Sequence, residues 1–83
     1  PHNSASSLST AATLQVDACT TNFVLQEIRP YERRQPGYVD VLVDNPESTL
    51  ADGYFAIPQG VGLCATLNEV ALADFVTWRG QAD

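Results

Sequence analysis

The amino-acid sequence predicts a small α+β domain, in which a mainly antiparallel sheet of four or five strands packs with one C-terminal helix and contains a single disulfide. Three observations lead to this fold class. Short runs rich in β-branched and aromatic residues alternate apolar with polar positions along the middle of the chain. A stretch near the C-terminus places its apolar residues at helical spacing. The chain has two cysteines, Cys19 and Cys64, so only one intramolecular bridge is possible.

The composition is that of a small folded domain. The chain has 83 residues, of which 45% are hydrophobic and 17% are charged. The hydrophobic residues are sufficient for a core, and the charged residues are too few for a disordered chain. Because a domain of this size buries a small share of its surface, a bond between Cys19 and Cys64 would stabilise it, by about 4 kcal/mol on the chain-entropy model. The alternative is a pair of separate buried thiols.

The expected strands follow a polar N-terminal segment. Residues 1–11 are mostly small and polar, which predicts a flexible arm rich in Ser, Thr and Ala, whereas residues 12–83 are expected to form a single globular domain. Strands are expected over residues 13–19, 21–28, 38–44 and 54–57 and around Cys64. Asn45, Pro46 and Glu47 match the cap, the first position and the first turn of a short helix.

The C-terminal helix is expected to begin near Thr66 and to end before Gly80. Thr66 and Glu69 match a capping box, and Gly80 is a typical helix stop. Phe75 and Trp78 share the apolar face of this helix, which predicts that both lie in the core. The same segment also alternates apolar and polar residues as a strand would, and the capping signals decide for a helix.

The charge of the chain excludes some classes of partner. The net charge is -6, from four Arg residues, no Lys and ten Asp or Glu residues. Such a chain has no broad basic surface, so no nucleic acid is expected as a partner. No stretch approaches the roughly 18 apolar residues of a membrane span, so no membrane insertion is expected. The chain contains no methionine, as expected of a processed product, an excised domain or a chain whose initiator methionine was removed.

Three of the four arginines lie between the second and third expected strands. Pro30 and Pro36 do not fit central strand positions, so this segment is expected to be a hairpin loop. Arginine and tyrosine are enriched at binding hot spots, and a loop stiffened by proline loses less entropy on binding. The candidate binding residues are therefore Arg29, Tyr31, Arg33 and Arg34. The alternative is a solvated loop whose arginines balance nearby carboxylates.

No constellation of residues indicates catalysis or a metal centre. The sole histidine, His2, lies on the expected arm, where nothing would fix its geometry. The acids Asp40, Asp44, Glu47 and Asp52 come close together in sequence but lack the ligand spacing of a calcium-binding loop. Two cysteines and one histidine give no zinc pattern. We therefore expect no catalytic residue, no metal, no cofactor and no enzymatic activity.

These observations favour a non-catalytic binding or assembly module of an extracellular or particle-surface protein, with the arginine-rich loop as its recognition element. The expected partner is another protein or a second copy of the chain. Two alternatives stay open. The stretch "DGYFAIPQGVG" resembles, through Asp52 to Phe55, the "DGYF" strands of the protruding domain of calicivirus capsid proteins, which implies a structural coat or capsid-type surface subunit. The other alternative is a serine-protease inhibitor that presents an exposed arginine loop.

Overall fold

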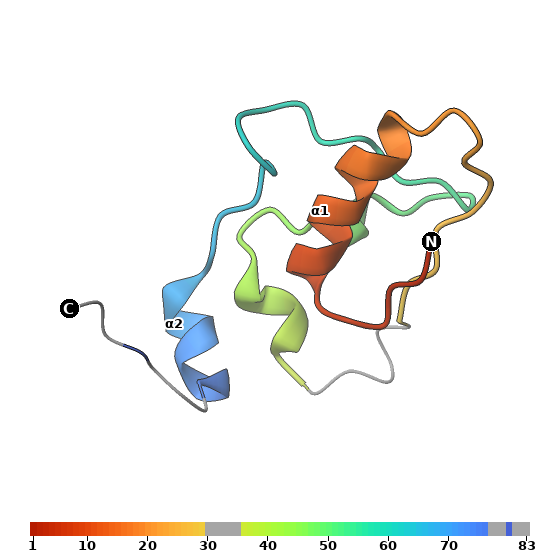
Figure 1. The fold of residues 1–83 in the computed structure, drawn as a ribbon. Coiled ribbons are helices and arrows are strands. Elements are labelled where there is room, and N and C mark those ends of the chain that lie inside the picture. The colour runs from red at the N-terminus through yellow and green to blue at the C-terminus, as the bar shows by residue number, and fades with distance from the viewer. Residues whose placement is uncertain (30–35, 77–79, 81–83) are drawn as a thin grey trace.

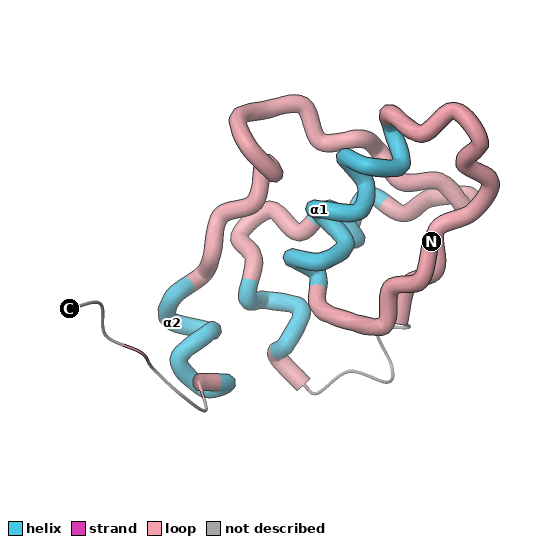
Figure 2. The backbone as a smooth tube through the Cα atoms, in the orientation of Figure 1, coloured by secondary structure: helices cyan, strands magenta, loops and turns pink. Residues whose placement is uncertain are grey.

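The computed structural model describes residues 1–29, 36–76 and 80. Within these residues the chain forms short helices joined by irregular segments, without a strand (Figure 1, Figure 2). The elements are, in chain order, α1 (Ser7–Ala18), the 3-10 helices η2 (Tyr38–Val41) and η3 (Pro46–Thr49), α2 (Glu69–Leu72) and the 3-10 helix η4 (Ala73–Phe75). No helix in these ranges is both long and apolar enough to cross a membrane.

The long helix α1 begins and ends at local signals in the sequence. The side chain of Ser6 accepts a hydrogen bond from the backbone N–H of Ser9 at 3.4 Å, which caps the N-terminus. After the last turn, the N–H of Cys19 donates to the carbonyl oxygen of Val16 at 3.2 Å. The buried residues recur every three or four positions and so share one face of the helix. They are Ser7, Thr10, Ala11, Leu14 and Asp17.

The contact between α1 and η3 is polar. Glu47 of η3 is 1% exposed, and its carboxylate accepts hydrogen bonds from Ser7 Oγ at 3.2 Å and Thr10 Oγ1 at 2.5 Å. Asn45 donates to Ser7 Oγ at 2.9 Å, and Asn3 donates to Thr10 Oγ1 at 2.9 Å. Buried polar groups destabilise a fold unless they are paired. These bonds therefore allow a polar cluster to join the N-terminal segment, α1 and η3.

A second contact joins η2 to the C-terminal helices. Leu42, which is buried, forms an isolated antiparallel bridge with Leu67. η2 packs against α2. The ring of Tyr38 meets the ring of Phe75 edge to face, with centroids 5.2 Å apart, which is a favourable aromatic geometry. Figure 1 shows η2, in green, between α1 and the blue α2.

The expected sheet of four or five strands is wrong. Residues 13–19, expected as the first strand, lie almost entirely in α1. Residues 38–44 begin with η2, and residues 21–28 have no regular structure. Alternating apolar residues form a stable strand only where other strands pair with it, and the described ranges contain only isolated bridges, such as that of Leu42. The α+β class is overturned with the sheet.

The expected C-terminal helix is shorter in the structure and begins later. Asn68, rather than Thr66, caps α2, because its side chain accepts a hydrogen bond from the N–H of Ala71 at 3.2 Å. η4 follows directly and ends at Phe75, which is half-buried. Trp78 lies outside the described residues.

The expected disulfide is also wrong. Cys19 is exposed at the end of α1, Cys64 is half-buried in an irregular loop, and both are free thiols. The thiol of Cys19 lies 3.3 Å from the carbonyl oxygen of Val16. Distant parts of the chain are joined instead by hydrogen bonds to the carboxylate of Glu47.

Part of the Ser/Thr/Ala-rich segment packs against the rest of the chain. Asn3, Ser7 and Thr10 are buried, and α1 begins within the segment. The division of the chain into an arm over residues 1–11 and a domain over residues 12–83 stays a prediction.

Candidate functional site

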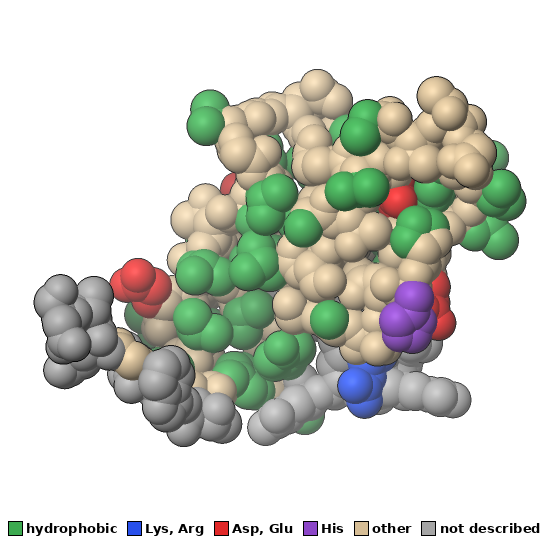
Figure 3. Space-filling view, viewed as in Figure 1, with side chains coloured by type: hydrophobic (Ala, Val, Ile, Leu, Met, Phe, Trp, Pro, Cys, Tyr) green, Lys and Arg blue, Asp and Glu red, His purple; other side chains and the backbone are tan. Residues whose placement is uncertain are grey.

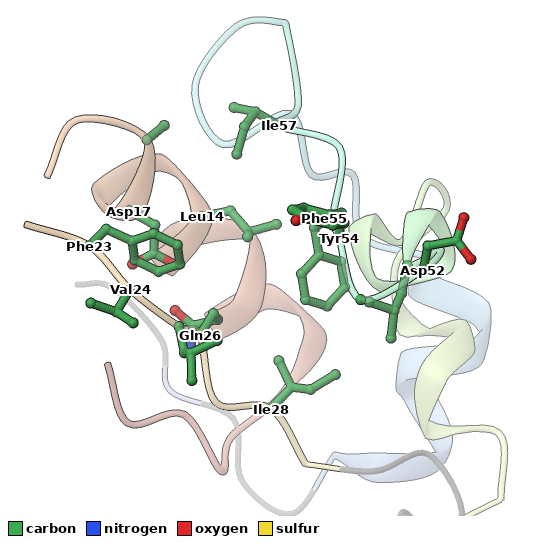
Figure 4. Close-up of a pocket in the computed structure, with 14 residues that line it drawn as sticks. Leu14, Asp17, Phe23, Val24, Gln26, Ile28, Asp52, Tyr54, Phe55 and Ile57 are labelled. Carbon is green, nitrogen blue, oxygen red and sulfur yellow. The ribbon is translucent and has the colours of Figure 1, made fainter. Parts of the chain in front are cut away.

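A cavity of about 590 Å³ opens beside the C-terminal half of α1 (Figure 4). Its wall comes from α1, from residues 23–28 and from residues 50–57. Most of the lining side chains are apolar, and Asp17, Gln26 and Asp52 are the principal polar ones. Small-molecule sites have this size and this mixture of apolar walls with a few polar groups.

A tight turn builds one side of the cavity. Ala51 and Tyr54 exchange two backbone hydrogen bonds of 2.9 Å, and the two residues between them have positive φ angles of 51° for Asp52 and 81° for Gly53. Positive φ at both central positions is the geometry of a type I′ turn, for which Asp-Gly is a preferred pair. The turn places the ring of Tyr54 at the cavity, opposite Phe23 (Figure 4).

The opposite side of the cavity is irregular and is held by few bonds. The N–H of Phe23 donates to the carbonyl oxygen of Thr20 at 3.2 Å. At the far end, the N–H of Glu27 donates to the carbonyl oxygen of Pro1 at 3.2 Å, and its carboxylate accepts from the N–H of Asn3 at 3.0 Å. These bonds hold residues 23 and 27, and the residues between them lie along the cavity.

Asp17 is the most unusual residue of this cavity. The side chain lines it and is only 7% exposed. Within the described residues, neither carboxylate oxygen of Asp17 has a hydrogen-bond partner. A buried carboxylate without a partner destabilises a fold, because it has lost its hydration and forms no hydrogen bond within the protein to replace it.

Gln26 adds a third acceptor to the same cavity. Its Nε2 donates to the carbonyl oxygen of Glu27 at 2.6 Å, which fixes the orientation of the amide. The amide oxygen Oε1 is buried and has no partner among the described residues. In Figure 4 the side chains of Asp17 and Gln26 lie on the same side of the cavity, beside Phe23 and Val24. Two residues of the cavity wall, Asp17 and Gln26, therefore carry three buried acceptor atoms among apolar side chains.

A metal ion does not fit the described residues. They contain no group of three or more His, Cys, Asp or Glu side chains that could hold one. The carboxylate of Glu47 already accepts from the hydroxyls of Ser7 and Thr10. Asp17 shares its cavity with the carboxylate of Asp52, which points away from it in Figure 4. Mg²⁺ requires about six oxygen ligands in octahedral geometry, and these positions do not supply them.

The residues predicted to bind a partner are only partly described. Arg29 is exposed and directly follows Ile28, which lines the cavity. Tyr31, Arg33 and Arg34 lie outside the described residues. Sequence reasoning missed Asp17, which lies three positions after Leu14 on the buried face of α1. A helical interpretation of this segment would have placed both on the same face.

The sole histidine has a partner in the structure. His2 Nδ1 pairs with the carboxylate of Glu27, and the histidine side chain is 79% exposed. Its Nε2 lies 3.5 Å from the hydroxyl oxygen of Ser4. The pair holds the first residues of the chain on the segment that ends the cavity wall, and it faces solvent.

Comparison with known proteins gives a family. The sequence model of the family described as enolase C-terminal domain-like matches residues 1–71. No curated protein and no solved structure matches the chain significantly. Because the match covers most of its length, the chain belongs to the enolase C-terminal domain-like family, whose members are domains of an enzyme superfamily.

Family membership corrects the function expected from the sequence. A non-catalytic binding or assembly module, a coat subunit and a serine-protease inhibitor are all inconsistent with a domain of an enzyme superfamily. The expectation of no enzymatic activity is contradicted by the same match, because the family belongs to an enzyme superfamily. The protein partner and the extracellular location stay predictions.

Proposed function

We propose that the chain is part of an enzyme of the enolase superfamily, which removes a proton from a carbon atom next to a carboxylate. The observation that carries this proposal is the family match over residues 1–71. Sites of this superfamily use a Lys or His base together with one or two Mg²⁺ ions that stabilise an ene-diolate.

Within such an enzyme, the chain would form part of the framework and binding region, and the base would come from polypeptide outside these residues. The sequence has no Lys and one histidine. The side chain of His2 is 79% exposed and pairs with Glu27. A general base must reach the proton it removes, and enzymes exclude water from that position. His2 does not meet the second condition, and the carboxylates described above do not fit a Mg²⁺ site.

The exposed apolar surface supports this role. Large apolar side chains are exposed over the described part of the chain, and Figure 3 shows hydrophobic groups across the visible face. Val61 is 98% exposed, Val70 is 86% exposed and Val43 is 60% exposed. Apolar surface of this extent marks places that other protein covers. Further polypeptide packed on it would complete the domain and bring the base.

The test is proton exchange in D₂O, followed by ¹H NMR on a panel of 2-hydroxy and 2-amino carboxylates in the presence of Mg²⁺. One sample is the protein isolated from its natural source, together with any polypeptide that completes the domain. The other is the 83-residue chain prepared alone. We expect exchange at the carbon next to the carboxylate in the first sample and none in the second.

Either of two results would overturn the proposal. If the protein from the natural source exchanges the proton next to the carboxylate in no compound of the panel, the proposed proton removal is refuted. Exchange by the isolated chain would place the base within it and refute the framework role. The variant His2→Gln would then identify the base, because His2 is the only side chain of the two base types in the chain.

A further inference from the structure

We propose that the cavity beside α1 is a binding site for a primary ammonium group carried on an apolar stem. This site is independent of the proposed enzymatic function, since it rests on groups of the chain itself. The geometry points to it through two features that occur together: a cavity of about 590 Å³ and a carboxylate that is buried in its wall without a partner.

The number and kind of polar atoms select the head group of the ligand. Within the described residues, two side chains of the cavity wall carry three buried acceptors without a partner: the two carboxylate oxygens of Asp17 and Oε1 of Gln26. A primary ammonium carries three N–H donors and no acceptor, so its donors match these atoms in number and in kind. Its positive charge also compensates the carboxylate, and hydrogen bonds between ionised groups are stronger than neutral ones.

Other head groups fit less well. A carboxylate or phosphate would be repelled by the buried carboxylate of Asp17. A hydroxyl has one donor and would leave acceptors of Asp17 and Gln26 unpaired. A purely apolar ligand would leave all three acceptors unpaired, and buried polar groups without a hydrogen bond are energetically unfavourable.

The apolar side chains of the cavity wall favour a ligand with an apolar chain. Leu14, Phe23, Ile28 and Phe55 contribute apolar surface around the polar atoms. Figure 4 shows the ring of Phe23 beside the carboxylate of Asp17, with Tyr54 and Phe55 across the cavity. A ligand with an alkyl or aryl chain would remove this surface from water while its ammonium group faces Asp17. The carboxylate oxygens are out of contact with solvent, so a neighbouring side chain must move before the ammonium reaches them. We assign this movement to the ring of Phe23, which lies beside Asp17 in Figure 4 and is 41% exposed.

The first experiment is a ¹⁵N NMR titration of the 83-residue chain with three probes of one length: n-hexylammonium, n-hexanol and hexanoate. We expect the ammonium to bind at least about tenfold more tightly than the alcohol, which is what a charged hydrogen bond contributes. Hexanoate should bind more weakly than either. The amide signals that move should belong to residues 14–28 and 50–57.

A pair of variants separates the buried carboxylate from the general acidity of the cavity. Asp17→Asn keeps the shape and removes the charge, so it should weaken n-hexylammonium binding at least about tenfold and change n-hexanol binding by less than about threefold. Asp52→Asn is the matched control, because Asp52 lines the same cavity but is exposed. It should change the affinity for either probe by less than about threefold.

A stability measurement gives a second readout that does not depend on a ligand. Without ligand, Asp17→Asn should melt at a temperature no lower than that of the parent, because the change removes an unpaired buried charge. The proposal is overturned if the alcohol and the ammonium bind equally, if the ammonium fails to bind at tens of millimolar, or if Asp17→Asn binds it as the parent does. If that variant does not fold, the three probes on the parent chain still decide.

Discussion

Replacement of Glu47 by alanine is the most direct test of the polar contact between α1 and η3. The carboxylate is 1% exposed and accepts hydrogen bonds from Ser7 at 3.2 Å and Thr10 at 2.5 Å. A hydrogen bond to a charged group contributes about 1.5 to 3 kcal/mol, and release of the buried charge offsets part of the loss. We therefore expect Glu47→Ala to lower the free energy of unfolding by about 3 kcal/mol. A chain of this length has only about 4 to 12 kcal/mol of stability in total.

The assay is urea unfolding, followed by circular dichroism at a wavelength that reports helix. With a slope of about 1 kcal/mol per molar urea, the loss lowers the midpoint by about 3 M. Glu47→Gln keeps one carbonyl acceptor for the two hydroxyls, so its midpoint should fall between those of the parent and the alanine variant. Asp44→Ala, at an exposed position, is the control and should lie within about 0.5 kcal/mol of the parent. A Glu47→Ala midpoint equal to that of the parent would refute the reasoning.

Three further substitutions and one thiol assay test other parts of the fold. Ser6→Ala removes the cap of α1 and should cost about 1 kcal/mol in thermal or urea unfolding, whereas Ser6→Asp should retain the cap. Cys19 and Cys64 should both react with iodoacetamide in the denatured, unreduced protein; a mass that shows no added groups would restore the disulfide. Gly53→Ala should cost about 1 kcal/mol through backbone strain alone, because φ is 81° and no atom lies within 4 Å of a Cβ placed there. Phe75→Ala removes the edge-to-face contact of a half-buried ring and should lower stability by about 2 kcal/mol, less than the cost at a fully buried site; an unchanged melting temperature would contradict the contact.

Local signals in the sequence predicted some details of the fold correctly. The short helix expected from Asn45, Pro46 and Glu47 is η3, in which Asn45 caps the N-terminus and Pro46 takes a first-turn position. These features depend on neighbouring residues only, so short-range chemistry is sufficient to predict them.

The long helix could not be recognised by hydrophobic periodicity, because much of its buried face is polar. Ser7, Thr10 and Asp17 occupy positions where a search for apolar repeats expects Leu or Val. In contrast, Leu14 and Val16 alternate with polar neighbours and imitate a strand, although Val16 is 59% exposed. Such a helix is identified only when its hydrogen-bond partners on Glu47 and Asn45 are known.

The candidate site escaped prediction for a related reason. Asp17 and Gln26 are neither close in sequence nor part of a catalytic motif, and their shared environment arises from the path of the chain after α1. The arginine-rich segment attracted attention because its composition departs from that of the rest of the chain. The family match extends over residues 1–71, of which that segment is a small part.

The polar contact beneath α1 has a consequence for how stability depends on temperature. Among the described residues, the largest fully buried side chains are those of Glu47, Thr10 and Ser7. Unfolding hydrates these groups, and hydration of polar surface lowers the heat capacity, whereas hydration of apolar surface raises it. The heat-capacity increment of this chain should therefore fall below the usual value of about 12 to 15 cal/mol/K per residue. The free energy of unfolding would therefore vary little with temperature. Cooling would destabilise this fold less than it destabilises a domain with an apolar core.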